Sequence, residues 1–360
     1  MGELERKLDL LRWWMTRERL SGVRLRGTDW FAWVTCGGSN VVLLTTDIGV
    51  AEVLVTHDAA AVLTDEIEVQ RLRDEEVGAG FDFVACPWTE RPGAIDRAVR
   101  DRTGAGEVAS DRPASGEVQL PKGLVSARWS LSPEEVDRYR ALGRDAAEAM
   151  TEVLRSARPE WTEWQLAGAG AEALWDRGIE PALTLVGGER RLPEYRHATA
   201  TREKLGSRAM LVFCGRRHGL FANLTRFVYF RAPSPDEVAS DAAVANVEAD
   251  LLDALRPGET LGRLYQVLAN AYARVGNAGA ERGHHQGGPC GYLSRDAIAV
   301  PGSELRIVKD GAAAFNPSLP GAKIEDSVVV GATGVEVLTA DAAWPARTVR
   351  GRRRPDLLVR

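Results

Sequence analysis

The side chains best suited to nucleophilic chemistry are two cysteines in the second half of the chain, Cys214 and Cys290. Cys290 lies in a glycine-rich turn, Gly-Gly-Pro-Cys-Gly-Tyr, five residues after His285, so attack of its thiolate on a carbonyl group is chemically possible. Free cysteines are more often small buried apolar residues, and we favour that interpretation for both. The glycines of the turn match neither a Walker loop nor a dinucleotide-binding fingerprint, so we interpret them as tight turns beside a pocket.

The composition excludes several functional classes. The 360 residues are 44% hydrophobic and 27% charged with a net charge of −5, which predicts a globular protein without a basic surface for nucleic acid. The basic run Arg350–Arg354 is expected to be a solvated end. We find no signal-peptide pattern and no apolar run of about eighteen residues, and therefore expect a cytoplasmic protein with no membrane partner. The four scattered cysteines predict reduced thiols.

Short apolar runs separated by helical patterns fill the first part of the chain, which predicts an α/β domain over residues 1–128. The polar stretch 103–123 is expected to be a connection. The expected helices cover residues 3–20 and 91–101, and the expected strands cover residues 31–36, 40–46, 51–57 and 81–88.

A different pattern begins with Ser132 and Glu135, which form a capping box and predict a helix to about residue 158. Thr162 and Gln165 form a second box and open a helix that ends near Gly178. Helices packed on a curved, largely antiparallel sheet are therefore expected over residues 129–345, followed by a basic tail at 346–360. The further expected strands cover 182–186, 208–214 and 219–230, the further helices cover 234–256 and 259–275, and strands and turns alternate over 281–340.

Three segments in this order resemble the pita-bread family of creatinase, prolidase, aminopeptidase P and methionine aminopeptidase. They are LTDEIEVQRLRDEE (63–76), LSPEEVDRYRALG (131–143) and RPGETLGRLY (256–265). The resemblance covers nearly the whole chain, and its strength lies in the order and spacing of the segments. It implies an α+β fold, with a C-terminal pita-bread domain and a smaller N-terminal α/β creatinase-like domain.

Metal-dependent members of this family hold two divalent ions with Asp, Asp, His, Glu and Glu, and the resemblance implies which positions correspond here. Asparagine is neutral and cannot bridge two cations, and phenylalanine cannot ligate at all. We therefore expect no dinuclear centre and no cofactor, with a single weakly held ion on His285, Glu325 and Cys214 as the alternative. In order, the five positions fall on Phe213 or Cys214, Asn223, His285, Asn316 and Glu325.

The segment Tyr195-Arg196-His197-Ala198-Thr199 is similar to one that places a histidine beside the family's site. In creatinase, the metal-free member, the matching histidine transfers the proton. The resemblance therefore implies that His197 is a general acid/base, and an ordinary pKa near 6.5 suits that role at neutral pH. The alternative is a histidine that only forms hydrogen bonds within a loop.

The retained His285 and Glu325 are expected either to act on the substrate as a second catalytic pair or to be relic ligands that satisfy each other's hydrogen bonds. Tyr292 stands where many members have a substrate-contacting histidine, so it is a candidate proton or hydrogen-bond donor. Asn223 and Asn316 are expected to orient the substrate.

Two arginines, Arg295 and Arg226, are candidate carboxylate clamps, with support of the sheet as the alternative for Arg226. Phe213 and Cys214 are expected to line the same pocket. Exchanging two carboxylates for amides makes the pocket more electropositive, which favours a small amino-acid-like substrate with an acidic group.

The leading hypothesis is a metal-independent, creatinase-like hydrolase or lyase that acts on a C–N bond of a small amide or amino-acid-like molecule. The alternatives are a non-catalytic protein that binds a ligand or partner and an atypical Xaa-Pro metallopeptidase. Because the family usually dimerises, we expect a homodimer, with Trp30, Phe31 and Trp33 as candidate contact residues.

Overall fold

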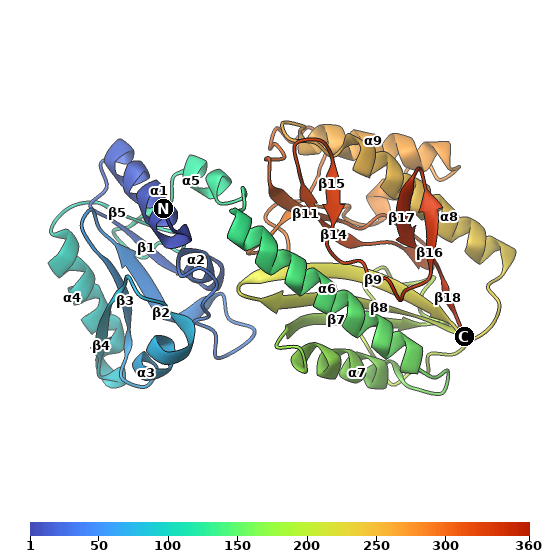
Figure 1. Cartoon of the computed structure of the whole chain (residues 1–360), viewed down its shortest axis with the longest axis horizontal. Helices are drawn as coiled ribbons and strands as arrows, with labels where there is room; N and C mark the ends of the chain where they lie inside the picture. The colour runs from blue at the N-terminus through green and yellow to red at the C-terminus, as the bar shows by residue number, and fades with distance from the viewer. The chain divides into compact units, whose positions relative to one another are not determined.

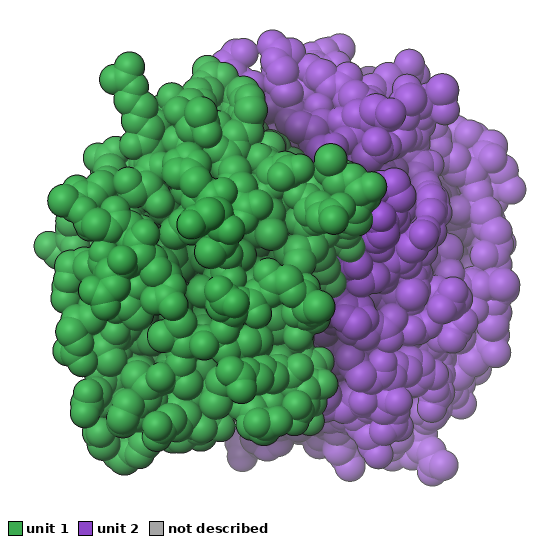
Figure 2. Space-filling view, turned by 60° about the vertical axis from the view of Figure 1, so that its left-hand side comes forward, with its two compact units in different colours: residues 1–128 green, residues 129–360 purple. Residues whose placement is uncertain are grey.

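The computed structural model describes residues 1–360 apart from the side chain of Pro92. The chain divides into two compact units, Met1–Arg128 and Trp129–Arg360, which are coloured green and purple in Figure 2. Among the described helices, none combines the length and the apolar composition needed to cross a lipid bilayer.

The first unit is a six-stranded mixed sheet in the order β4-β3-β2-β1-β5-β6, with helices packed against it (Figure 1). Its strands are β1 (Gly22–Gly27), β2 (Ile48–Val55), β3 (Ala60–Asp65), β4 (Asp82–Cys86), β5 (Val108–Ser110) and β6 (Val118–Gln119). Its helices are α1 (Glu3–Glu18), α2 (Thr28–Val34), α3 (Val69–Arg71), α4 (Arg91–Thr103) and α5 (Lys122–Ala127), with a π-helical turn at Leu72–Glu76 and a 3-10 turn at Trp88–Glu90.

The helices expected at 3–20 and 91–101 are confirmed as α1 and α4, whereas two expected strands are wrong. The apolar run 31–36 belongs mostly to the buried helix α2, because a short apolar run does not distinguish a buried strand from a buried helix. The run 40–46 forms no strand, and Leu43 within it is 66% exposed. The expected connection at 103–123 supplies strand β5 and the edge strand β6.

The aromatic residues considered for a subunit contact lie in the core of the first unit instead. Trp30, Phe31 and Trp33 are all buried on α2, and the two tryptophan rings meet edge to face with 5.3 Å between centroids. The guanidinium of Arg128 lies 4.3 Å from the ring centroid of Trp30 and also donates to Asp29 at 2.6 Å. These aromatic side chains are therefore satisfied within one chain and are not available to a partner.

The second unit contains two four-stranded sheets, ordered β10-β11-β14-β15 and β18-β9-β8-β7, whose pairs are antiparallel except for β18 with β9. The long strands are β7 (Glu180–Gly188), β8 (Arg208–Arg217) and β9 (Leu220–Tyr229). The others are β10 (Gly287–Cys290), β11 (Gly311–Phe315), β12 (Ser318–Leu319), β13 (Ala322–Lys323), β14 (Asp326–Val330), β15 (Val335–Val337), β16 (Ala346–Val349), β17 (Arg352–Pro355) and β18 (Leu358–Val359).

Four helices cover these sheets: α6 (Pro133–Ser156), α7 (Glu163–Trp175), α8 (Pro235–Ala254) and α9 (Leu261–Arg274), with a 3-10 turn at Ala280–Gly283 (Figure 1). Both expected capping boxes are confirmed. The Ser132 hydroxyl accepts from the Glu135 amide at the start of α6, and the Thr162 hydroxyl accepts from the Gln165 amide at the start of α7. Each box satisfies amide groups that the first turn of a helix leaves without an intrahelical acceptor.

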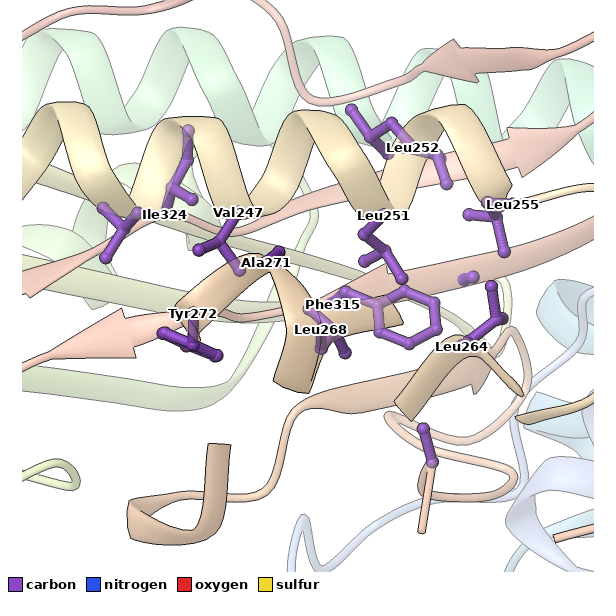
Figure 3. Packing of buried hydrophobic residues seen from close by; sticks show 14 of the residues in the cluster. Val247, Leu251, Leu252, Leu255, Leu264, Leu268, Ala271, Tyr272, Phe315 and Ile324 are labelled. Carbon is purple, nitrogen blue, oxygen red and sulfur yellow. The ribbon is translucent and has the colours of Figure 1, made fainter. Parts of the chain in front are cut away.

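The largest described core of the second unit lies where α8 and α9 pack on each other and on the sheet of β11 and β14 (Figure 3). Leu251 of α8 and Leu268 of α9 are fully buried there, beside Phe315 at the end of β11. Truncating one of these leucines to alanine costs about 2–5 kcal/mol in a typical core. This packing holds the end of β11 firmly, and β11 leads directly into the candidate site.

The basic C-terminal segment is part of the fold, so the expectation of a solvated end is wrong for Arg354, the last residue of the run 350–354. Arg354 on β17 is 3% exposed. Its guanidinium donates at 2.7 Å to each of two buried carboxylates, Glu248 of α8 and Asp326 of β14. Two buried anions need compensating cations: Arg354 contacts both carboxylates, and Arg226 also pairs with Asp326.

Candidate active site

A cavity of about 130 Å³ lies between the two sheets of the second unit. The sheets are joined beside it, because Thr225 of β9 pairs with Glu325, just before β14, through an antiparallel bridge. Eight of the ten residues that the sequence suggested line this cavity, together with Leu183, Leu185, Val212, Ser294 and Lys323. The eight are His197, Phe213, Cys214, Asn223, His285, Arg295, Asn316 and Glu325.

Strand pairing positions several of the side chains that line the cavity. Cys214 of β8 stands opposite Asn223 of β9, and β9 is tied to β14 by a 2.8 Å hydrogen bond from the Asn223 amide to the Ser327 hydroxyl. Asn316 follows β11, and its backbone amide donates to the Gln286 carbonyl at 3.1 Å. Residues almost a hundred positions apart are thus fixed around one cavity by backbone pairing.

The carboxylate of Glu325 is surrounded by positive charge. Arg295 Nη2 donates to Glu325 Oε1 at 2.5 Å, and Lys323 Nζ lies 3.3 Å from Oε2, which also accepts from the Thr225 hydroxyl at 2.8 Å. Burial alone would raise the pKa of this carboxyl, but Lys323, Arg295 and the Thr225 hydroxyl outweigh it and lower the pKa to about 2. Glu325 is therefore ionised at every physiological pH.

The charged groups of the cavity do not balance. Arg295 and Lys323 are cations and Glu325 is the one carboxylate among the described lining residues, which leaves an excess of one positive charge. Three lining residues also carry a buried polar atom without a hydrogen-bond partner among the described residues: Asn316 Oδ1, Arg295 Nε and His285 Nδ1. Unpaired buried polar atoms are uncommon and are typical of sites that bind a ligand.

His197 lies in the loop between β7 and β8, which is anchored by the buried carboxylate of Glu163. Glu163 accepts from the amide of Gly188 at 2.8 Å, from the amide and hydroxyl of Thr201 at 2.9 and 2.7 Å, and from Arg191. Arg191 also donates to the Thr199 carbonyl at 2.9 Å. A buried charge satisfied by four donors fixes the loop and, with it, the position of His197.

Three histidines meet at the cavity. The Nε2 atoms of His197 and His284 are 2.9 Å apart, so one ring donates a hydrogen bond to the other, and the rings of His284 and His285 stack with 4.4 Å between centroids. Gly287 follows the histidine pair and allows β10 to pair closely with β11: its φ is +88°, and a Cβ there would lie 2.2 Å from the Ala314 carbonyl oxygen.

The three imidazoles are held in their neutral form. Partial desolvation lowers the pKa of His197, and the charge of Lys323 lowers it further. Desolvation first, and then the neighbouring cationic groups, lower the pKa of His284 to about 3 and that of His285 to about 4. At neutral pH each ring can therefore accept a proton but does not carry a charge.

Sequence reasoning missed two residues of this site, His284 and Lys323. His284 precedes His285 directly, and the doublet itself was the available signal. Lys323 stands two residues before Glu325, a spacing that places both side chains on one face of an extended segment. Lysine is scarce in this chain, but nothing in the sequence shows that this one is buried.

Two suggested residues are not brought to the cavity. Tyr292 is buried elsewhere, and its hydroxyl donates to Glu135 Oε1 at 2.7 Å. Arg226 donates to Asp326 Oδ1 at 2.7 Å and to the backbone carbonyls of Glu325 and Thr339 at 3.2 and 2.9 Å. Arg226 thus supports the strand that carries Glu325, which was the alternative considered for it.

The cysteines are poor nucleophiles in this setting. Burial raises the pKa of Cys214 to about 12 and that of Cys290 to about 11, so both thiols stay protonated at neutral pH. Cys290 lies 3.4 Å from the Tyr139 hydroxyl in the core. Cys214 contributes a wall of the cavity and no reactive thiolate.

Two sheets that enclose a polar cavity, with helices outside and a separate α/β unit before them, define a two-domain pita-bread protein. Residues 137–332, more than half of the chain, match the sequence model of metallopeptidase family M24. The chain therefore belongs to that family. The predicted family and α+β fold class are therefore confirmed. No match was found among curated proteins by sequence.

Solved structures agree with this fold over nearly the whole chain. Dipeptidase PepE from Mycobacterium ulcerans is 20% identical with a TM-score of 0.77, covering 99% of this chain and 98% of that one. An X-Pro aminopeptidase from Thermotoga maritima is 16% identical with a TM-score of 0.78, and both chains are covered completely. A prolidase from Pyrococcus horikoshii is 15% identical with a TM-score of 0.77, over 93% of this chain and 98% of that one.

The residues at the cavity do not fit the pair of divalent ions that the resemblance to metal-dependent members implies. Glu325 is the one carboxylate among the described lining residues, and its oxygens already face Arg295, Lys323 and the Thr225 hydroxyl. Two fixed cations beside this carboxylate repel further positive charge, and Asn223 and Asn316 offer only neutral amides. The proposed reaction therefore gives no role to a pair of divalent ions.

Proposed function

We propose that this protein hydrolyses a C–N bond in a small substrate that carries a carboxylate or another anionic group, without a pair of metal ions. Membership of a metallopeptidase family supports a peptidase-type hydrolase. The observation that carries the proposal is the placement of Arg295 and Lys323 on either side of Glu325 inside the cavity.

The charge of the cavity supports the choice of substrate class. A single anionic group on the substrate would neutralise the excess positive charge of the lining residues. Arg295 donates from Nη2 to Glu325 and from Nη1 to the Ser294 carbonyl, and its Nε, which has no partner among the described residues, is the donor left for a substrate carboxylate. Leu183, Leu185 and Val212 give the rest of the wall an apolar character, which fits a small aliphatic portion of the substrate.

His197 is the proposed general base and acid. Its lowered pKa keeps the ring neutral, so it can take a proton from a water molecule as the water oxygen bonds to the carbonyl carbon. The same ring then gives the proton to the leaving nitrogen as the C–N bond breaks. His284, 2.9 Å away, would orient the ring, and the side-chain amide of Asn316 or the guanidinium of Arg295 would stabilise the oxyanion.

A screen with matched ligand pairs tests the proposal. Dipeptides and N-acyl amino acids are compared with their decarboxylated analogues by thermal shift, using the wild type and Arg295→Met. We expect the carboxylates to stabilise the wild type, the analogues to have little effect, and the variant to lose the difference. Equal stabilisation by both members of every pair would overturn the substrate class.

The ligands that stabilise the wild type are then tested for turnover, which distinguishes catalysis from binding. Release of primary amine is measured for the wild type and for His197→Phe, with chelator present throughout. We expect turnover in the wild type only, while ligand-induced stabilisation persists in the variant. Ligands that bind both proteins and are never cleaved would support a non-catalytic binding protein instead, and cleavage that requires added manganese would support an atypical metallopeptidase.

A further inference from the structure

Three of the five histidines in this chain meet at one point, although His197 lies about ninety positions from the other two. Each of His197, His284 and His285 offers one ring nitrogen, and these three atoms all lie within 4.8 Å of one another. The remaining two histidines, His57 and His218, lie outside this group.

The geometry is close to what a metal ion requires. Zinc binds imidazole nitrogen at about 2.0–2.1 Å in tetrahedral geometry, which places two ligand nitrogens about 3.3 Å apart. The Nε2 atoms of His197 and His284 are 2.9 Å apart and would have to separate slightly, whereas the widest pair of ring nitrogens, within 4.8 Å, would have to move closer. Rotations of exposed or half-buried side chains supply such shifts.

Few other groups compete for the ring nitrogens of this cluster. Among the described residues, His197 Nε2 and His284 Nε2 are hydrogen-bonded to each other, and His285 Nδ1 is buried and has no hydrogen-bond partner. Buried ring nitrogens without a partner are costly to maintain and point to a ligand that would satisfy them.

We propose that His197, His284 and His285 form a binding site for one divalent transition-metal ion of the zinc class, distinct from the two-ion centre implied by the family. Three imidazoles without a carboxylate favour zinc, cobalt, nickel or copper over magnesium, calcium or manganese. Three protein ligands leave a fourth position for water. Of the positions that the family's metal ligands would occupy, only His285 belongs to this site.

The neighbouring cations set the strength of the site. Lys323 and Arg295 line the same cavity and oppose a further positive charge. Binding should therefore be weaker than the roughly 10–16 kcal/mol of structural zinc sites, and we expect a Kd on the order of 1 µM. One consequence rests on the proposed function: an ion bound to His197 removes the base, so zinc should inhibit turnover.

The test uses the full chain without a histidine tag. Zinc is titrated calorimetrically, and cobalt is titrated by visible absorption, into the wild type, His284→Phe, His285→Phe and the control His57→Phe. We expect one ion per chain in the wild type and in the control. Affinity should fall at least tenfold in either site variant, since even outer partners of metal ligands contribute 10–100-fold.

Thermal unfolding in metal-free buffer shows whether each variant is folded. Two site variants are included so that the test can still be made if one of them does not fold. Absence of binding in the wild type, two ions per chain, or unchanged affinity in a folded site variant would overturn the site. Because binding is read without any substrate, its failure leaves the proposed hydrolase untouched, and an inactive enzyme that binds zinc leaves the site standing.

Discussion

Arg295 and Glu325 form an ion pair inside the cavity, with 2.5 Å between Nη2 and Oε1, and Lys323 lies 3.3 Å from the other carboxylate oxygen. The protein therefore supplies its own cations to the carboxylate that the resemblance identifies as a retained metal ligand. This arrangement is the basis for proposing that the cavity binds an anionic substrate and not additional metal ions.

The ion pair predicts which of two substitutions, Glu325→Gln or Arg295→Met, lowers the unfolding free energy more. Glu325→Gln leaves two buried cations without their common partner, and we expect it to cost about 4 kcal/mol of unfolding free energy. Arg295→Met should cost less, because Lys323 still compensates the carboxylate. Urea denaturation of both variants measures this order, and a larger cost for Arg295→Met would contradict the arrangement.

The same carboxyl predicts a pH dependence of stability. Its pKa is about 2 in the folded protein and 4.5 ordinarily, so its contribution is complete above about pH 4.5 and is lost as the pH falls toward 2. The difference between the two pKa values corresponds to about 3 kcal/mol. In urea unfolding, the stability gap between wild type and Glu325→Gln should narrow by about 2 kcal/mol from pH 6 to pH 3. A gap that stays constant would argue against the depressed pKa.

Glu163 should control the loop that carries His197. Glu163→Gln leaves Arg191 without its buried partner and weakens the hydrogen bonds to Gly188 and Thr201, at an expected cost of about 3 kcal/mol. Hydrogen exchange should accelerate selectively in residues 186–204. The matched control is Glu203→Gln, an exposed acid in the same loop, which should leave both stability and exchange nearly unchanged.

Two adjacent arginines in the C-terminal segment should behave differently. Arg354→Met leaves Glu248 buried without its ion-pair partner and leaves Asp326 with Arg226 alone, so we expect it to lower the unfolding free energy by about 3 kcal/mol. Arg353 is exposed, and Arg353→Met should change the unfolding free energy by about 0.5 kcal/mol or less. Equal effects in chemical denaturation would show that the buried network does not stabilise the fold.

Much of the fold could be predicted from local sequence signals. The capping boxes at Ser132 and Thr162 predicted the starts of α6 and α7, because a cap depends on residues only three positions apart. The run 31–36 was misread because burial on every side removes the periodicity that separates helix from strand. The packing of Arg354 depends on acids far away in the sequence and had no local signal.

The candidate site also contains some residues that could be predicted from the sequence and others that could not. Resemblance predicted the set around His197, His285 and Glu325, because short motifs mark those positions. The contact of Tyr292 could not be predicted, since it is fixed by the distant carboxylate of Glu135. For Arg226 the sequence left substrate binding and support of the sheet open, and only the contact with Asp326 distinguishes them. The pairing of His284 with His197 likewise requires the fold.

Hydrolysis of an anionic substrate without a pair of metal ions can be measured as the release of amine in the presence of a chelator. Carboxylate-bearing dipeptides and N-acyl amino acids are incubated with tag-free protein, in chelator and in parallel with added manganese. We expect amine release that persists in chelator, is not raised by manganese, and is lost in His197→Phe. Release that vanishes in chelator and returns with manganese would contradict it.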